Sequence, residues 1–439
     1  MRILGPLLSI RANSELFFCG RQALVLIFLV AFLIRVVFVF TLKDGFYFSD
    51  EFEYTVIAGY LVEHGTLPES FDRSPLFPVF LAGLFKLGGE NLFYIRIVQA
   101  TLGAIIALEI ALIGKRVGGS GVGIVAGALW AIYPMGVFMS GILYPAILLT
   151  SLMTSAVLCL LAKRDSPAYV AWVALAGLLL GAGTLTKPMA FSSIVFVALW
   201  LFTQRRSGRL RLLLVSIFLG SALMSLLPWT LHNAVKHGEF VAVEARSLDE
   251  LVPWAENATA PTVKGKRGQG QLIQAKGDST PVAQPSADSK LAGMLTRMAK
   301  RYPGEFMSFF ELYPTRVGYL VQSERERARK KVSDRIVRYI PFGSDLVMAV
   351  SIFSVGPLYL FAVVGMACMW RGREKRRELS LFVLLVMSFA LSYAVSWGKI
   401  RYRIPVDPYI ILLSAWGVVA VWNSVFKKGP TALRGQDPA

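Results

Sequence analysis

Two adjacent acids near the start of the chain, Asp50 and Glu51, are the residues whose placement most suggests chemistry. They lie in the stretch FYFSDEFEY, just after an apolar run from Ala23 to Leu42 that is long enough to cross a bilayer. Acidic groups at a membrane surface are costly unless they have a partner or a function. A carboxylate beside a cationic pocket can take the proton of an incoming hydroxyl while the cations stabilise a phosphate leaving group. The alternatives are a solvated loop tip and a salt-bridge partner for those cations.

A short loop near the other end of the chain supplies candidate cations. The connection GKIRYRIP contains Lys399, Arg401 and Arg403, where the distribution of charge elsewhere predicts few basic residues. A guanidinium presents a planar fork that suits phosphate oxygens, so this loop indicates a phosphate site. The alternatives are contact with anionic lipid headgroups and an ion pair with the nearby Asp407.

Three further cations are predicted near the same membrane surface. They are Arg73 in FDRSPLFP, Arg96 at the head of the second apolar run and Lys187 in TLTKP at the end of the fifth. Each alone is typical of a snorkelling anchor, but their convergence with the acid pair favours a binding site. Arg35 lies inside the first apolar run and is interpreted as a buried structural charge or a snorkelling side chain.

Aromatic and polar residues close the seventh apolar run and continue after it. The motif PWTLHN ends with His232 and Asn233, and the motif VPWAEN contains Trp254 and Asn257. A tryptophan at a membrane interface is usually an anchor. Trp254 lies beyond the apolar run, however, and could stack on a sugar ring.

Composition restricts the class of protein. Of 439 residues, 55% are hydrophobic and 17% are charged, which indicates a polytopic membrane protein rather than soluble domains. The net charge of +18 falls largely in short loops, where Lys and Arg set orientation, so it does not indicate nucleic-acid binding. Three cysteines and three histidines show neither a disulfide framework nor metal-ligand spacing, and we expect no metal.

The apolar runs predict an all-α polytopic fold with about ten transmembrane helices. They lie near 23–42, 92–113, 121–140, 143–162, 168–186, 189–203, 210–231, 346–370, 379–397 and 405–425. The run from Leu76 to Leu87 is too short to cross and predicts a re-entrant or interfacial helix.

The same pattern divides the chain into three parts. Residues 1–231 form an N-terminal transmembrane module whose first outer loop, 43–91, carries the acid pair. Residues 232–345 form a long outer loop, and residues 346–439 form a C-terminal module with a cytoplasmic tail. Basic short loops predict that both termini are cytoplasmic, in a plasma or bacterial inner membrane, with the first span kept as an anchor.

Taken in order, these motifs resemble those of the integral-membrane glycosyltransferases that use polyprenyl-phosphate sugars, the group of protein O-mannosyltransferases and the bacterial lipid A aminoarabinose transferase. The likeness covers nearly the whole chain, and its motifs run in the same order. They are Asp50-Glu51 with Tyr54, Ala58 and Gly65, Arg73-Ser-Pro75 with Pro78, Arg96 and Gln99, Thr-Lys187-Pro, Pro228-Trp229 with Asn233, and RYRIPVDP at Arg401 to Pro408.

The resemblance implies a role for each candidate residue. Asp50 would act as general base on an acceptor hydroxyl, with Glu51 assisting, in a transfer that inverts the anomeric centre and needs no metal or cofactor. The donor phosphate would be bound by Arg73, Arg96, Lys187, Lys399, Arg401, Tyr402 and Arg403. The sugar or the acceptor would be met by Tyr54, His232, Asn233, Trp254 and Asn257. The expected partners are a polyprenyl-phosphate-linked sugar, membrane lipids and an acceptor lipid, protein or glycan.

The chain departs from the family at several positions. Many relatives carry Arg in place of Lys187, an acidic residue where Tyr144-Pro145 stands, and Arg in place of His232. The long loop also differs from the compact outer domain of the larger relatives. Two other functions stay open: a lipid-sugar flippase or transporter, which would have charges near the bilayer midplane, and a ligase or polymerase with a diphosphate donor.

Overall fold

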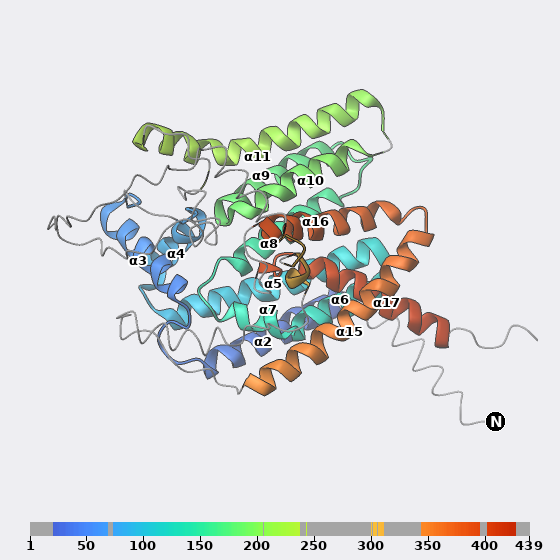
Figure 1. Ribbon diagram of the computed structural model, residues 1–439, viewed down its shortest axis with the longest axis horizontal. Helices are drawn as coiled ribbons and strands as arrows, with labels where there is room; N and C mark the ends of the chain where they lie inside the picture. Colours follow the sequence, from blue (N-terminus) through green and yellow to red (C-terminus); the bar gives the residue numbers. More distant parts are fainter. Residues whose placement is uncertain are drawn as a thin grey trace, which may run out of the picture.

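The chain is an elongated bundle of helices in the computed structural model, which describes residues 21–68, 73–204, 206–237, 243, 300, 302–304, 306–310, 344–395 and 402–426. In chain order the named helices are α2 (Arg21–Thr41), α3 (Ser49–His64), α4 (Leu76–Gly88), α5 (Leu92–Gly118), α6 (Ser120–Ile132), α7 (Pro134–Ser140), α8 (Ala146–Leu160), α9 (Tyr169–Thr186), η1 (Pro188–Ala190), α10 (Phe191–Phe202), α11 (Gly208–His237), α15 (Ser344–Arg371), α16 (Arg376–Val395) and α17 (Asp407–Phe426). The helices α3 and α4 lie together at one end of the bundle, which we call the α3–α4 end (Figure 1).

Each apolar run predicted to span the membrane is mostly helical over its described residues, but helix length supports fewer spans than ten. Seven of the described helices are long and apolar enough to cross a bilayer, and α6 with α7 forms an eighth candidate, bent by 56°. The helices α8 and η1–α10 are apolar but shorter, at Ala146–Leu160 and Pro188–Phe202. The chain is therefore an all-α multi-pass membrane protein, with seven or eight candidate spans among its described residues.

Two boundaries refine the sequence-based prediction. The short run at Leu76 is the helix α4, which has 13 residues and packs mainly against α3. The helix α11 continues to His237, which carries it past the predicted start of the long loop at residue 232. Most of that predicted loop lies outside the described residues.

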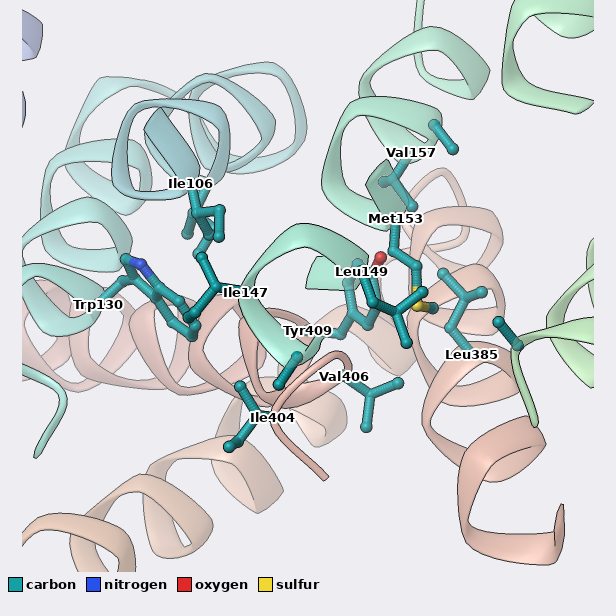
Figure 2. Close-up of a cluster of buried hydrophobic side chains, with 14 of the residues drawn as sticks. Ile106, Trp130, Ile147, Leu149, Met153, Val157, Leu385, Ile404, Val406 and Tyr409 are labelled. Atoms are coloured by element: carbon teal, nitrogen blue, oxygen red, sulfur yellow. The ribbon is translucent and has the colours of Figure 1, made fainter. Parts of the chain in front are cut away.

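Apolar side chains from helices far apart in the sequence fill the middle of the bundle. The cluster in Figure 2 joins Trp130 of α6, Met153 of α8, Leu385 of α16 and Tyr409 of α17. Glycines allow the closest helix pairs to approach, since a Cβ at Gly365 would lie 1.9 Å from the carbonyl oxygen of Leu413. Such small residues suit a membrane bundle, where van der Waals packing replaces the hydrophobic effect between helices.

The break between α6 and α7 is explained by Pro134 and by Arg35. A proline disfavours helical geometry at the preceding residue, and Tyr133 is extended, with φ −63° and ψ 112°. The break leaves carbonyl groups at the end of α6, and Arg35 donates to those of Trp130 and Ala131 at 3.2 and 3.1 Å. Arg35 is fully buried, so it is a structural charge and not a snorkelling side chain.

Candidate active site

Asp50 lies in the first turn of α3, at the α3–α4 end of the bundle. A negative charge is favoured in the first turn of a helix, where backbone N–H groups have no helical partner. Its carboxylate accepts a hydrogen bond from Nη2 of Arg73 at 3.2 Å. The side chain is largely but not fully buried, so a small group can still approach it from solution.

Arg73 lies just before α4, and its side chain contacts residues of α3. Its Nε and Nη2 atoms donate to one carboxylate oxygen of Glu53 at 2.9 and 2.5 Å, and its guanidinium lies 5.4 Å from the ring centroid of Tyr54. Burial lowers the pKa of Arg73, but Tyr54 and the carboxylates of Asp50 and Glu53 more than offset it, so the pKa lies above its ordinary value. The guanidinium is therefore permanently charged.

The helix α9 ends just before Lys187, because Pro188 follows this residue. The residue before a proline is pushed into extended geometry, and Lys187 has φ −153° and ψ 122°. Its ammonium group lies 5.3 Å from the ring centroid of Tyr144 and 5.7 Å from that of Tyr402. A cation at the C-terminal end of a helix is also favoured by the helix dipole.

The tyrosine rings connect the two cations. The rings of Tyr54 and Tyr144 meet edge to face with centroids 6.4 Å apart, and Tyr402 stacks on Tyr393 at 4.4 Å. We call Arg73, Lys187, Tyr54, Tyr144 and Tyr402 the cation–tyrosine cluster. Five segments far apart in the sequence contribute to it, and Asp50 lies at its edge. Two cations beside one carboxylate can bind a phosphate and accept a proton in the same place.

Glu51 is adjacent to Asp50 in sequence but has a different environment. It is fully buried, and its carboxylate accepts hydrogen bonds from the backbone N–H groups of Tyr47 and Phe48 at 2.8 Å and of Leu143 at 3.0 Å. Burial raises the pKa of Glu51 to about 7, against the effect of these three bonds and of Arg96. Glu51 therefore joins the start of α3 to the non-helical residues before α8, which include Tyr144.

Arg96 supports the residues at the start of α3 and not the cation–tyrosine cluster. Its two Nη atoms donate to the carbonyl oxygens of Lys43 and Gly45 at 3.0 and 2.5 Å. The side chain is buried, with its guanidinium over the ring of Tyr47. These contacts hold the loop between α2 and α3, so they do not support the prediction that Arg96 binds phosphate.

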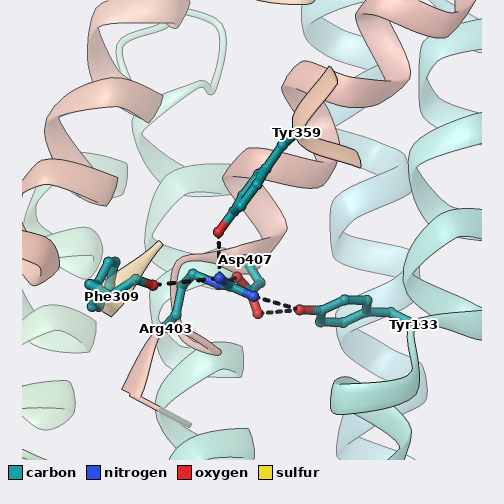
Figure 3. Close-up of polar contacts among 5 residues, drawn as sticks. All are labelled: Tyr133, Phe309, Tyr359, Arg403 and Asp407. Atoms are coloured by element: carbon teal, nitrogen blue, oxygen red, sulfur yellow. Dashed lines mark hydrogen bonds and ion pairs between the residues drawn. The ribbon is translucent and has the colours of Figure 1, made fainter. Parts of the chain in front are cut away.

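Arg403 forms a buried ion pair, which was the structural alternative for this residue. Its Nε donates to Asp407 at 2.7 Å, and its other nitrogens donate to the hydroxyls of Tyr359 and Tyr133 and to the carbonyl oxygen of Phe309 (Figure 3). Asp407 also accepts from Tyr133 at 2.7 Å. This geometry gives Arg403 a role in fixing the turn that follows Tyr402, and its contact with a donor phosphate stays a prediction.

The remaining predicted residues are placed only in part. His232 is exposed on α11 and stacks on Trp229 with ring centroids 5.6 Å apart, while Asn233 is buried. Lys399, Arg401, Trp254 and Asn257 lie outside the described residues. Within the described part of the chain, no three His, Cys, Asp or Glu side chains gather as a metal site requires. The roles proposed for these residues in binding donor, sugar or acceptor stay predictions.

Two members of the site were not expected from the sequence. Glu53 lies three residues after Asp50, on the same face of α3, and this spacing is a signal that two side chains can share one partner. Tyr144 gives no such signal, because it lies in a short non-helical stretch that Glu51 and Gln99 hold from other helices.

Comparison with known proteins finds solved structures of similar fold. The archaeal oligosaccharyltransferase AglB from Archaeoglobus fulgidus, solved with an inhibitory peptide and a dolichol-phosphate, is similar in fold, with a TM-score of 0.55 and 15% identity over 95% of this chain and 52% of its own. ArnT from Cupriavidus metallidurans, bound to undecaprenyl phosphate, is similar with a TM-score of 0.55 and 14% identity over 92% of this chain and 62% of its own. The fold is thus similar to that of these two proteins, although the chain spans only about half to three fifths of their length.

A protein-family model matches part of the chain. Residues 72–232 match the model described as dolichyl-phosphate-mannose-protein mannosyltransferase. This segment is therefore similar to that family, and it runs from the residue before Arg73 through Lys187 to His232. No curated protein sequence matches the chain.

Proposed function

We propose that the protein transfers a sugar from a polyprenyl-phosphate donor to the hydroxyl of an acceptor at the outer face of the membrane. The observation that carries this proposal is the meeting of Asp50 with Arg73 at 3.2 Å, beside a second cation in the same tyrosine cluster. The family match and the shared fold support the choice of a lipid-linked phosphate as donor.

The proposed reaction uses the two kinds of charge at once. The acceptor oxygen forms a bond to the anomeric carbon, and the bond from that carbon to the phosphate oxygen breaks with its electron pair left on the phosphate. Asp50 takes the hydroxyl proton, and inversion follows from attack on the face opposite the leaving group. Arg73 and Lys187 stabilise the charge that develops on the phosphate. Lys399 and Arg401, which lie outside the described residues, are proposed to stabilise the same charge.

The adjacent acids Asp50 and Glu51 have different roles in the proposed reaction. Asp50 is the base because its carboxylate touches Arg73 and is partly exposed. Glu51 is a positioning residue because its carboxylate accepts from backbone N–H groups and has no exposed surface. Basic short loops between helices support an orientation with the α3–α4 end outside and both termini cytoplasmic, as in a bacterial inner membrane.

The test is the variant Asp50→Asn, which keeps the size of the side chain and removes its basicity. We expect transfer to fall about 10²- to 10⁴-fold, because this is the usual contribution of a general base. The measurement is mass spectrometry of membrane lipids and glycans in cells that lack the gene and express the variant. Binding of undecaprenyl phosphate by the purified variant should stay near normal.

The matched control is Asp44→Asn, in the exposed loop before α3 at the same end of the bundle. It should restore the missing product fully. A fully active Asp50→Asn protein would refute the assignment of the base. A donor carrying a diphosphate is the second candidate, and it is separated by identifying the lipid product, which would then be a polyprenyl diphosphate.

A further inference from the structure

Glu53 occupies the Nε–Nη2 edge of Arg73, which is one of the edges through which a guanidinium can bind a phosphate. One oxygen of Glu53 accepts from both Nε and Nη2, while Asp50 accepts a second bond from Nη2. Tyr54 lies against the guanidinium at 5.4 Å from its ring centroid. The planar fork that suits phosphate oxygens is therefore already engaged by a carboxylate of this chain.

Glu53 differs from Asp50 in how easily it can leave. Its side chain is 51% exposed, against 19% for Asp50 and 14% for Arg73. A half-exposed carboxylate keeps much of its hydration, so releasing it into water costs little, whereas a buried partner would be left uncompensated. Glu53 can move away from Arg73 while Asp50 stays in place as the base.

Charge changes during the proposed reaction make such a mobile partner useful. A polyprenyl-phosphate sugar is a phosphodiester with one negative charge. After transfer the lipid product is a phosphomonoester, which carries up to two negative charges near neutral pH. Arg73 and Lys187 thus hold the product more tightly than the donor. When the product leaves, Arg73 loses the negative charge that the phosphate supplied.

We propose, on the basis of the proposed function, that Glu53 is the counter-ion of Arg73 in the donor-free protein and competes with the lipid phosphate for it. The donor displaces Glu53 on binding. Glu53 returns to Arg73 when the product leaves, and this return speeds release. Glu53 is a positioning residue, since it acts on the lipid phosphate only through Arg73.

The experiment measures binding of undecaprenyl phosphate to the full chain in nanodiscs. The variant Glu53→Gln should bind about three- to fivefold more tightly, because an exposed ion pair contributes about that factor and its loss leaves Arg73 to the ligand. The control is Glu63→Gln, on the same helix, where the carboxylate is 75% exposed and contacts His64 at 4.0 Å. It removes the same charge without touching Arg73, and its affinity should equal that of the unaltered chain.

Two further arms separate competition from a structural effect. In an Arg73→Ala background, Glu53→Gln should leave the affinity unchanged. In a transfer assay, Glu53→Gln should lower both the KM for the donor and kcat, and undecaprenyl phosphate should inhibit it more strongly. A merely structural role would instead weaken binding and raise KM.

The outcomes distinguish this inference from the proposed function. If the unaltered chain binds undecaprenyl phosphate and Glu53→Gln binds it equally or more weakly, the competition is refuted and the proposed function stands. A gain of affinity that persists without Arg73 also refutes it. If the unaltered chain shows no binding, the proposed function fails and this inference fails with it.

Discussion

Two arginine–carboxylate pairs of the bundle differ in what surrounds them. Arg73 and its partner carboxylates are 14%, 19% and 51% exposed, whereas the side chains of Arg403 and Asp407 are 1% and 4% exposed. Arg403 has one carboxylate and two tyrosine hydroxyls as partners, so its charge is balanced and its donors are directed at the protein. Arg73 shares its charge with two carboxylates, one of which can leave.

This difference in exposure distinguishes an arginine that stabilises the fold from an arginine that can bind a ligand. A buried pair resists exchange, because a departing partner would leave an uncompensated charge in a medium of low polarity. A partly exposed pair exchanges partners at small cost. Among the described cations of the candidate site, Arg73 and Lys187 therefore fit a phosphate, and Arg403 fits a structural role.

The largest expected effect comes from breaking the buried pair. Arg403→Ala should destabilise the protein by about 3–5 kcal/mol, because Asp407 would stay buried without its cation. Arg73→Ala should cost about 1 kcal/mol or less and should instead weaken binding of undecaprenyl phosphate. Thermal unfolding in detergent, measured beside lipid binding on both variants, checks this opposition.

A double variant serves as the control for the buried pair. Arg403→Met together with Asp407→Leu replaces both charges by apolar groups of similar size, which recovers much of the lost stability in other buried pairs. The comparison breaks down if Arg73→Ala unfolds the protein as readily as Arg403→Ala.

A second expected effect concerns the adjacent acids, and it depends on pH. Burial raises the pKa of Glu51 to about 7 from an ordinary value of 4.5, so the folded protein binds a proton at Glu51 more tightly than the unfolded chain does. The stabilisation from this proton is full below pH 4.5, declines as pH rises through about 7, and is absent above it. The total is on the order of 3 kcal/mol, since one pKa unit corresponds to about 1.4 kcal/mol.

The measurement is the midpoint of thermal unfolding between pH 5 and pH 8. It should fall with pH in the unaltered chain and change little in Glu51→Gln, which is less stable throughout because an amide nitrogen cannot accept from backbone N–H groups. Asp50→Asn should keep the slope of the unaltered chain. A Glu51→Gln protein with that same slope would assign the pH dependence to another group.

Local sequence patterns predicted the helices well and the partners of charges less well. Apolar runs and prolines act through neighbouring residues, so α4 and the end of α9 before Pro188 could be read directly, whereas α3 lies within the predicted outer loop 43–91 and was missed. The ion pair of Arg403 was visible as an alternative because Asp407 is four residues away. The contact of Arg73 with Glu53 was missed, since it joins α3 to a segment 20 residues later and depends on how α4 packs.

Tyr144 and Arg96 show the same limit. Tyr144 reaches Lys187 from a backbone that Gln99 and Glu51 hold at the two preceding residues, Ile142 and Leu143. Arg96 has the residue type and depth of a phosphate ligand, but carbonyl groups of the preceding loop take its donors. Which anion or carbonyl pairs with a given arginine is decided by tertiary packing, and one sequence does not contain that information in local form.

The smallest expected effect links the two arginine pairs through Tyr402. Its ring stacks on Tyr393 and lies 5.7 Å from the ammonium of Lys187, and it stands beside Arg403 in the turn that the buried pair fixes. Tyr402→Ala should weaken binding of undecaprenyl phosphate about two- to fivefold, as expected for one cation–π contact. Tyr402→Phe keeps the ring and should bind nearly as well as the unaltered chain. Equal losses of affinity in both variants would mean that the hydroxyl of Tyr402, and not its ring, positions Lys187. The buried pair of Arg403 and Asp407 would then act on the site through a hydrogen bond of that hydroxyl.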